Sequence, residues 1–190
     1  MIKLKYGNTN TFFIHGLLLD TDFAGTLPAF YQVLKKNGLK VGDIRYVLAT
    51  HYHPDHMGIL GDLAEQGAKH LLMDVQKDSI HGADYIFERE GLPFVPLMES
   101  KATVISCAES RAFLAELGIA GEIISIPSHS RDSVAVILDD GDCFVGDLEP
   151  FEYLEAYGEN KQLENDWAQI LSHHPKRIFF AHAPERNLKD

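Results

Sequence analysis

The sequence predicts a layered fold of the α/β (or α+β) class, and three observations lead to it. Short β-branched and apolar segments alternate with helical segments along the chain. Two runs of strands are each followed by helices, which suits two sheets with helices on their outer faces. The length of 190 residues allows one domain with a sizeable core, over residues 1–190, and is too short for two comfortable ones.

The elements of the first half follow from apolar runs and from turn residues. Strands are predicted in four segments, 2–6, 11–20, 44–49 and 69–73, with turns at Gly7-Asn8 and His15-Gly16. A helix is predicted from Thr26 to Asn37, because Pro28 lies in its first turn and Gly38 is a stop signal. A second helix is predicted from Met57 to Gln66, closed by Gly67.

The second half begins with an irregular segment, 75–100, which is interrupted by glycine and proline. Helices are predicted over 108–117 and 161–172. Strands are predicted in five segments, 102–106, 122–126, 133–138, 142–145 and 177–180. The third and fourth of these form a hairpin, because Asp140-Gly141 between them is a strong turn signal.

Composition limits the kinds of partner. The formal net charge of −11 argues against a nucleic-acid backbone, which would favour a basic face. No apolar stretch approaches the length of a membrane span, and residues 1–5 lack the apolar core of a signal peptide. We therefore expect a soluble cytoplasmic protein with a small-molecule substrate, binding neither nucleic acid nor membrane. The oligomeric state is left open.

The most specific feature is the segment from His51 to His56, which reads His-Tyr-His-Pro-Asp-His. Neither a regular helix nor a regular strand requires three imidazoles and a carboxylate within six positions. These side chains are the ligands that suit zinc and its first-row neighbours. The segment follows the buried strand predicted over 44–49, and loops at strand ends commonly carry reactive groups. His51 and His53 alternate along an extended backbone, so we expect them to point the same way. A metal site is predicted here.

This H-x-H-x-D-H segment resembles the signature of the metallo-β-lactamase superfamily. The later ligands that such a resemblance requires follow in the expected order: His129 in Ile-Pro-Ser-His-Ser, Asp147 at the end of Cys-Phe-Val-Gly-Asp, and His182 in Ala-His-Ala-Pro. The resemblance implies a four-layer αββα sandwich. It also implies seven metal ligands, namely His51, His53, Asp55, His56, His129, Asp147 and His182.

The chain departs from the family pattern at several positions that are not ligands. They are Asp22, where the family commonly has glycine; Ser128, Arg131 and Asp132 around His129; and Ala181 and Ala183 around His182. These differences bear on loop geometry and on the substrate pocket, while all seven ligand positions keep the expected residue types.

The resemblance implies a dinuclear centre, with two Zn²⁺ per chain expected and iron or manganese possible with the same ligands. His51, His53 and His129 would hold one metal, Asp55, His56 and His182 the other, and Asp147 would bridge them. Two such ions share a water and lower its pKa, which gives a bridging hydroxide for hydrolysis. Asp55 is the one catalytic residue predicted beyond ligation, because its second oxygen could orient the nucleophile or pass a proton. Asp20 is expected to orient a ligand imidazole by a hydrogen bond; its alternative is a turn residue at a strand end.

The expected activity is hydrolysis of a small ester, thioester or lactone. The alternatives are a mononuclear iron oxidoreductase that resembles persulfide dioxygenases, a phosphodiesterase on the same centre, and a closed metal-binding module. The substrate-binding residues are unknown. Aromatic and sulfur-containing side chains could line a pocket or belong to the core: Tyr85, Phe87, Phe94, Met98, Phe151, Tyr153 and Tyr157.

The remaining histidines and the two cysteines are expected to be structural. Cys107 and Cys143 are too few for a disulfide framework and are predicted to be buried or half-buried; for Cys143 a place beside the metal ligands stays open. His81 lies in the irregular segment that could cover the site, but a solvated loop residue is the expected description.

Overall fold

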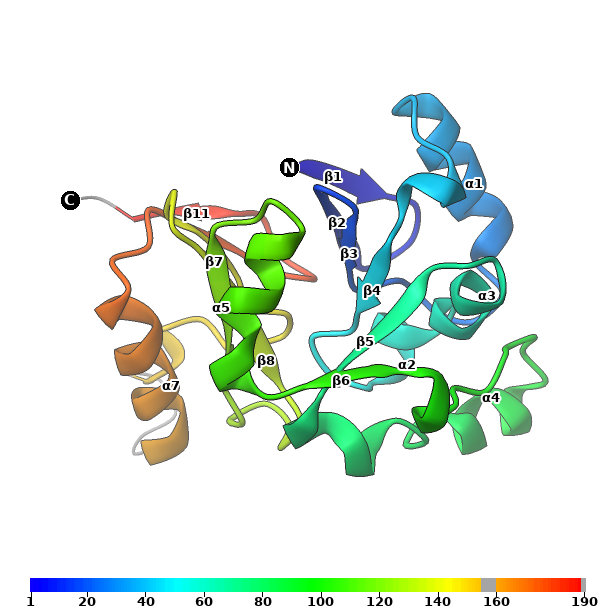
Figure 1. Ribbon diagram of the computed structural model, residues 1–190. Helices are drawn as coiled ribbons and strands as arrows, with labels where there is room; N and C mark the ends of the chain where they lie inside the picture. The colour runs from blue at the N-terminus through cyan, green and yellow to red at the C-terminus, as the bar shows by residue number, and fades with distance from the viewer. Residues whose placement is uncertain (155–159, 189–190) are drawn as a thin grey trace. The chain divides into compact units, whose positions relative to one another are not determined.

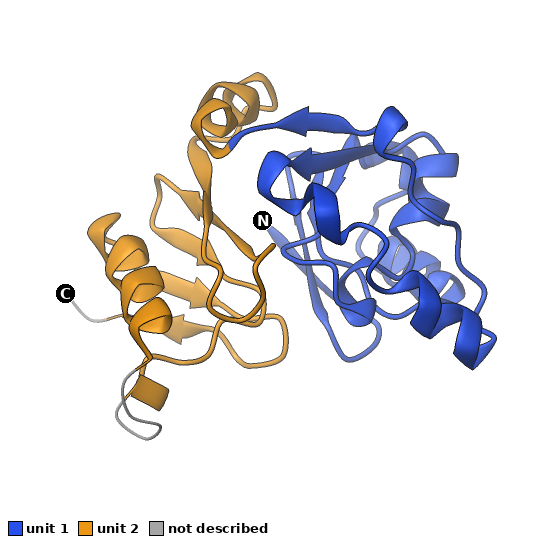
Figure 2. Ribbon diagram, turned by 90° about the horizontal axis from the view of Figure 1, so that it is seen from below, with its two compact units in different colours: residues 1–106 blue, residues 107–190 orange. Residues whose placement is uncertain are grey.

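The computed structural model describes residues 1–154 and 160–188, and these form two compact units, residues 1–106 and residues 107–190 (Figure 2). Each unit contains one β-sheet and its own helices (Figure 1). Both sheets and their helices agree with the mixed α/β class predicted from the sequence. The prediction of a single domain over 1–190 stays a prediction.

Unit 1 is built on a six-stranded sheet in sequential order. Its strands are β1 (Ile2–Lys5), β2 (Asn10–Ile14), β3 (Leu17–Leu19), β4 (Tyr46–Leu48), β5 (Lys69–Met73) and β6 (Thr103–Ile105). The first three strands pair antiparallel, and β3 to β6 pair parallel. The parallel strands β3, β4 and β5 are mostly buried, which explains their continuous apolar sequences.

The helices of unit 1 cover one face of this sheet. They are α1 (Leu27–Lys36), α2 (Pro54–Met57), α3 (Leu60–Glu65) and α4 (Asp84–Glu90), with 3₁₀ turns η1 (Val41–Asp43), η2 (Asp74–Ser79) and η3 (Glu99–Lys101). Phe30 and Leu34 of α1, Leu63 of α3 and Phe87 of α4 join buried strand residues in one apolar core. Burial of such side chains contributes roughly 1.5–3 kcal/mol each and fixes the sheet under these helices.

Unit 2 is built on a five-stranded sheet in the order β11-β10-β9-β8-β7. Its strands are β7 (Gly121–Ser125), β8 (Val134–Leu138), β9 (Asp142–Phe144), β10 (Arg177–Phe179) and β11 (Arg186–Asn187), and its helices include α5 (Cys107–Glu116) and α7 (Lys161–Ser172). Leu163, Trp167 and Ile170 of α7 pack on buried residues of β7 to β10. Their spacing of three and four residues places them on one face of the helix.

One predicted helix is wrong. The segment 57–66 is divided between α2, which begins at Pro54, and α3, with a break at Gly58 and Ile59. At Gly58 the chain passes so close to another backbone that a Cβ atom would lie 2.1 Å from the Ala24 nitrogen. His56 lies inside α2. Within the described residues, no helix is both long and apolar enough to cross a membrane.

Candidate metal centre

The His51–His56 segment follows β4, at the carboxyl end of a buried parallel strand, as predicted. The His51 and His56 side chains are buried, at 1% and 0% exposure, whereas His53 is exposed. The His51 ring centroid lies 4.4 Å from that of His53 and 4.0 Å from that of His56. Asp55 Oδ2 lies 4.0 Å from His56 Nε2. Unit 1 therefore gathers three imidazoles and one carboxylate at a single point.

Asp20 orients this segment from the end of β3. Its Oδ1 accepts a hydrogen bond from the Thr50 backbone N–H at 2.6 Å, and its Oδ2 accepts one from the Thr50 hydroxyl at 2.9 Å. The same Oδ2 lies 3.1 Å from His56 Nδ1. A carboxylate this close to Nδ1 favours the neutral ring that carries its proton there, which makes Nε2 the candidate ligand atom.

The backbone of Asp20 explains how its side chain reaches both partners. β3 and β4 pair in parallel with Leu19 opposite Leu48, and the Asp20 N–H continues this ladder by donating to the Leu48 carbonyl at 2.9 Å. Asp20 then adopts a left-handed φ of 56°, which aspartate tolerates better than most residues. The carboxylate is 2% exposed, and its role in orienting a ligand imidazole stays a prediction.

Two further side chains hold the ligand segment, and neither was predicted from the sequence. Buried Gln76 in η2 donates from Nε2 to the Ala49 carbonyl at 2.9 Å and the Thr50 carbonyl at 3.3 Å. The Thr9 hydroxyl donates to the Asp55 carbonyl at 2.7 Å. Both partners come from segments distant in sequence, so only the folded chain identifies them.

In unit 2, the three predicted ligands follow three different strands. His129 follows β7, Asp147 follows β9 and His182 follows β10. Gly146 has a left-handed φ of 57°, a conformation that glycine adopts without the steric cost of a side chain, and it turns the chain at Asp147. Asp147 Oδ1 lies 3.3 Å from His182 Nε2, and Asp147 Oδ2 lies 3.9 Å from His129 Nε2. One carboxylate thus stands within reach of both imidazoles.

Asp166 of α7 supports the His129 loop and was missed at the sequence level. Its Oδ2 accepts a hydrogen bond from the Ser128 backbone N–H at 2.8 Å, and its Oδ1 accepts one from Gln162 Nε2 at 3.0 Å. Asp166 is only 2% exposed. A signal existed, because Asp166 lies between Leu163 and Trp167 on the apolar face of α7, where a carboxylate needs a specific partner.

A cavity of about 350 Å³ in unit 2 opens beside these ligands. Its lining includes His129, Asp147 and His182, together with Tyr153 and Phe180. Among the described residues of the aromatic set considered, Tyr153 lines this cavity beside the ligands, and it is 43% exposed.

The other candidate pocket residues have different places. Phe87 and Phe94 belong to the core of unit 1, and Tyr85 is 67% exposed. Tyr157 lies outside the described residues. The segment 75–100 contains α4 and most of η2, so it is less irregular than predicted. It supplies core residues and surface residues, and the substrate contacts stay unidentified.

The residues expected to be structural have structural surroundings. Cys143 packs in the apolar core of unit 2, where burial raises the pKa of its thiol, and Cys107 is half-buried at the start of α5. His81 is exposed and pairs with Asp84 at 2.8 Å. Both findings agree with the predictions made from the sequence.

The donor set of each unit fits a divalent metal ion of the first transition row. Imidazole nitrogen and carboxylate oxygen are the preferred ligands of zinc, and iron and manganese accept them as well. In unit 1, a ring nitrogen of His51 lies within 4.8 Å of a ring nitrogen of His53, and likewise within 4.8 Å of one of His56. A carboxylate oxygen of Asp55 lies within 4.8 Å of a ring nitrogen of His56. The chain therefore carries candidate histidine and aspartate metal ligands, and a metal is the cofactor that these residues suit.

Comparison with known proteins places this arrangement in a family. The model of the metallo-β-lactamase superfamily matches residues 4–182. Among solved structures the chain is similar to TTHA1623 in a di-iron-bound form, with a TM-score of 0.71, 22% identity, and 98% of this chain and 93% of that chain covered. No curated protein matches the chain.

Two further structures show the same fold. ST1585 from Sulfolobus tokodaii, an archaeal metallo-β-lactamase superfamily protein, has a TM-score of 0.65 and 18% identity over 98% of this chain and 80% of that one. The metallo-β-lactamase MIM-1 from Novosphingobium pentaromativorans has a TM-score of 0.64 and 16% identity, with 95% of this chain and 76% of that chain covered. The match to the family model and the two sheets with their helices confirm the predicted fold class, and the chain belongs to the metallo-β-lactamase superfamily.

Proposed function

We propose that the chain is a metal-dependent hydrolase that cleaves a small ester, thioester or lactone at a dinuclear centre, with zinc as the expected metal. The observation that carries the proposal is the convergence of nitrogen and oxygen ligands in each unit, with buried Asp20 directing His56. The proposed ligands are His51, His53 and His129 for one ion and Asp55, His56 and His182 for the other, with Asp147 shared. Two bound ions would supply a hydroxide nucleophile at neutral pH and polarise the scissile carbonyl.

The protein side chains have separate roles in this proposal. Asp20 fixes the orientation of His56, and Asp166 fixes the loop that carries His129. Asp55 would hold the metal with one carboxylate oxygen and would accept a proton from the attacking water with the other. Its side chain is half-buried, at 26% exposure, so this second oxygen can reach both the site and solvent.

The supporting test is hydrolysis by the zinc-loaded chain. We expect activity on p-nitrophenyl acetate, a short acyl thioester or a γ-lactone, and a loss of about 100-fold or more in kcat for Asp55→Asn through the lost proton acceptor. Glu65→Gln, on α3 and outside the proposed ligand set, serves as the matched control and should keep wild-type rates. A fully zinc-loaded protein that hydrolyses none of the three classes would contradict the proposal.

A second candidate function has a specific observation in its favour. The structure of TTHA1623 contains two iron ions, and the same ligand types would accept iron in this chain. An iron-dependent oxidoreductase would show iron after purification without added metal and oxygen consumption with a persulfide. Hydrolysis of bis(p-nitrophenyl) phosphate alone would instead favour phosphodiester cleavage. A cytoplasmic location and a small-molecule partner stay predictions from the sequence.

A further inference from the structure

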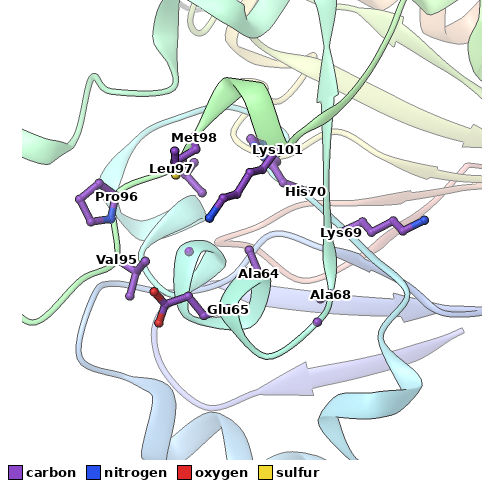
Figure 3. A pocket seen from close by; sticks show the side chains of 12 residues that line it. Ala64, Glu65, Ala68, Lys69, His70, Val95, Pro96, Leu97, Met98 and Lys101 are labelled. Carbon is purple, nitrogen blue, oxygen red and sulfur yellow. The ribbon is translucent and has the colours of Figure 1, made fainter.

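Unit 1 contains a second cavity whose lining includes none of the proposed metal ligands (Figure 3). It has a volume of about 520 Å³, within the range of roughly 300–1,000 Å³ that is typical of small-molecule sites. Its wall is formed by α3, the start of β5 and the segment 95–101. The cavity is therefore large enough for a ligand and belongs to a single compact unit.

The wall of this cavity is a packed structure. At Gly61 of α3, a Cβ atom would lie 1.9 Å from the Val95 carbonyl oxygen, so the segment 95–101 rests directly on the helix backbone. Ala68 and Leu97 are buried at 5% and 4% exposure. Together with Ala64 and Val95 they give the cavity an apolar surface against which an alkyl chain can pack.

The cavity also contains a buried imidazole. His70 and Leu72 are two residues apart in β5, so the His70 side chain projects from the same face of the strand as the core residue Leu72. His70 is 4% exposed, and its Nε2 lies 2.5 Å from the Tyr52 hydroxyl. Its Nδ1 has no hydrogen-bond partner within residues 1–154 and 160–188. When the Tyr52 hydroxyl donates to Nε2, the neutral ring carries its proton on Nδ1 and can donate there.

A lysine reaches over the same cavity. In Figure 3 the Lys101 side chain extends across the opening, whereas that of Lys69 points away from it. The Lys69 ammonium lies 5.6 Å from the centre of the Tyr46 ring. Lys101 has no ion pair with any described residue, so its ammonium is available to a ligand. Burying a carboxylate requires such a partner.

We propose that this cavity binds a small amphipathic monocarboxylate. The ligand carboxylate would pair with the Lys101 ammonium, beside the wall that contains His70, and its apolar chain would pack on Ala64, Val95 and Leu97. Glu65 also lines the cavity and would repel a second carboxylate, which favours a monoacid over a diacid. The site is independent of the proposed hydrolase activity.

Octanoate is the probe we would use on the full-length protein, by calorimetry and by ¹H–¹⁵N NMR. We expect saturable binding, with chemical-shift changes concentrated at residues 64–70 and 95–101. Octanamide, which lacks the charge, and suberate, which has a second carboxylate, should each bind at least about three-fold more weakly. No saturable binding up to about 10 mM would overturn the proposal, as would equal binding of octanamide.

Two lysine variants make the test specific. Lys101→Met should weaken octanoate binding about three- to ten-fold, because it removes the ion pair. Lys69→Met makes the same change in charge at a side chain that points away, and should change binding by less than about two-fold. Equal effects of the two substitutions would show a general charge effect and overturn the assignment. Ala64→Phe, checked for folding by circular dichroism, should abolish binding by filling the cavity; octanoate binding unchanged in this folded variant would place the ligand elsewhere.

Discussion

Asp20→Asn tests whether Asp20 supports metal binding through His56, apart from any contribution that it makes to the stability of the fold. It conserves shape and the left-handed φ of 56°, which asparagine tolerates. The amide can still accept from the Thr50 N–H, but it lacks the second carboxylate oxygen that accepts from the Thr50 hydroxyl and the negative charge that lies 3.1 Å from His56 Nδ1. The variant therefore loses the contact that directs His56 Nε2.

The magnitude follows from the number and burial of these contacts. A buried hydrogen bond to a charged group contributes about 1.5–3 kcal/mol, and loss of a carboxylate behind a ligand histidine typically lowers metal affinity about 10- to 100-fold. We expect the variant to unfold in urea with a free energy about 1–3 kcal/mol lower in the metal-free form. We expect zinc binding, measured by competition with a chromophoric chelator, to weaken about 10- to 100-fold.

Asp22→Asn is the matched control. Asp22 is equally buried, at 3% exposure, and its carboxylate accepts hydrogen bonds from the Thr9 and Phe23 backbone N–H groups at 3.1 Å and 2.7 Å. Its substitution should lower stability by a comparable amount and leave zinc affinity within about three-fold of wild type. Wild-type zinc affinity in Asp20→Asn, or an equal loss in Asp22→Asn, would refute the orienting role of Asp20.

Three further predictions test other parts of the structure. Asp147→Ala should lose one metal and nearly all hydrolytic activity while circular dichroism shows an intact fold; a fully active variant that retains both metals would refute the shared-ligand role. Asp166→Ala should lower the free energy of unfolding by about 1–3 kcal/mol, since the half-buried Ser128 N–H loses its acceptor, and an unchanged urea midpoint would contradict this. Burial lowers the pKa of His70 to about 4 from an ordinary value near 6.5, so between these pH values the unfolded chain binds a proton that the folded chain does not. The free energy of unfolding should therefore fall as pH falls from 6.5 to 4, by up to about 3 kcal/mol more in wild type than in His70→Gln. Above pH 7 the two proteins should show the same dependence of this free energy on pH. The same dependence from pH 6.5 to 4 would show that His70 is not the cause.

The elements best predicted from sequence are those with a strong local pattern. Lys69–Met73 and Lys161–Ser172 have the predicted bounds, because an apolar run and a three-to-four residue period specify them locally. The helix predicted over 57–66 was wrong because its break depends on the approach of Gly58 to Ala24, a tertiary contact. The two residues of β11 had no local signal at all.

The site shows the same division. The ligand types and their order were readable because imidazole and carboxylate side chains rarely cluster without a chemical reason. The supports were readable only in part: Asp20 follows directly after a strand, whereas Gln76 lies in the 3₁₀ turn η2 and reaches Ala49 and Thr50 only in the folded chain. The position of Asp166 on the apolar face of a helix suggests from sequence that its carboxylate needs a partner. The sequence does not identify that partner as the Ser128 N–H.

The most direct test of the dinuclear centre is metal stoichiometry. The metal-free protein would be saturated with zinc, desalted and measured by elemental analysis against chain concentration. The seven proposed ligands predict two tightly bound zinc ions per chain, falling to one in Asp147→Ala. One ion or none in the saturated wild-type protein would contradict the proposed centre.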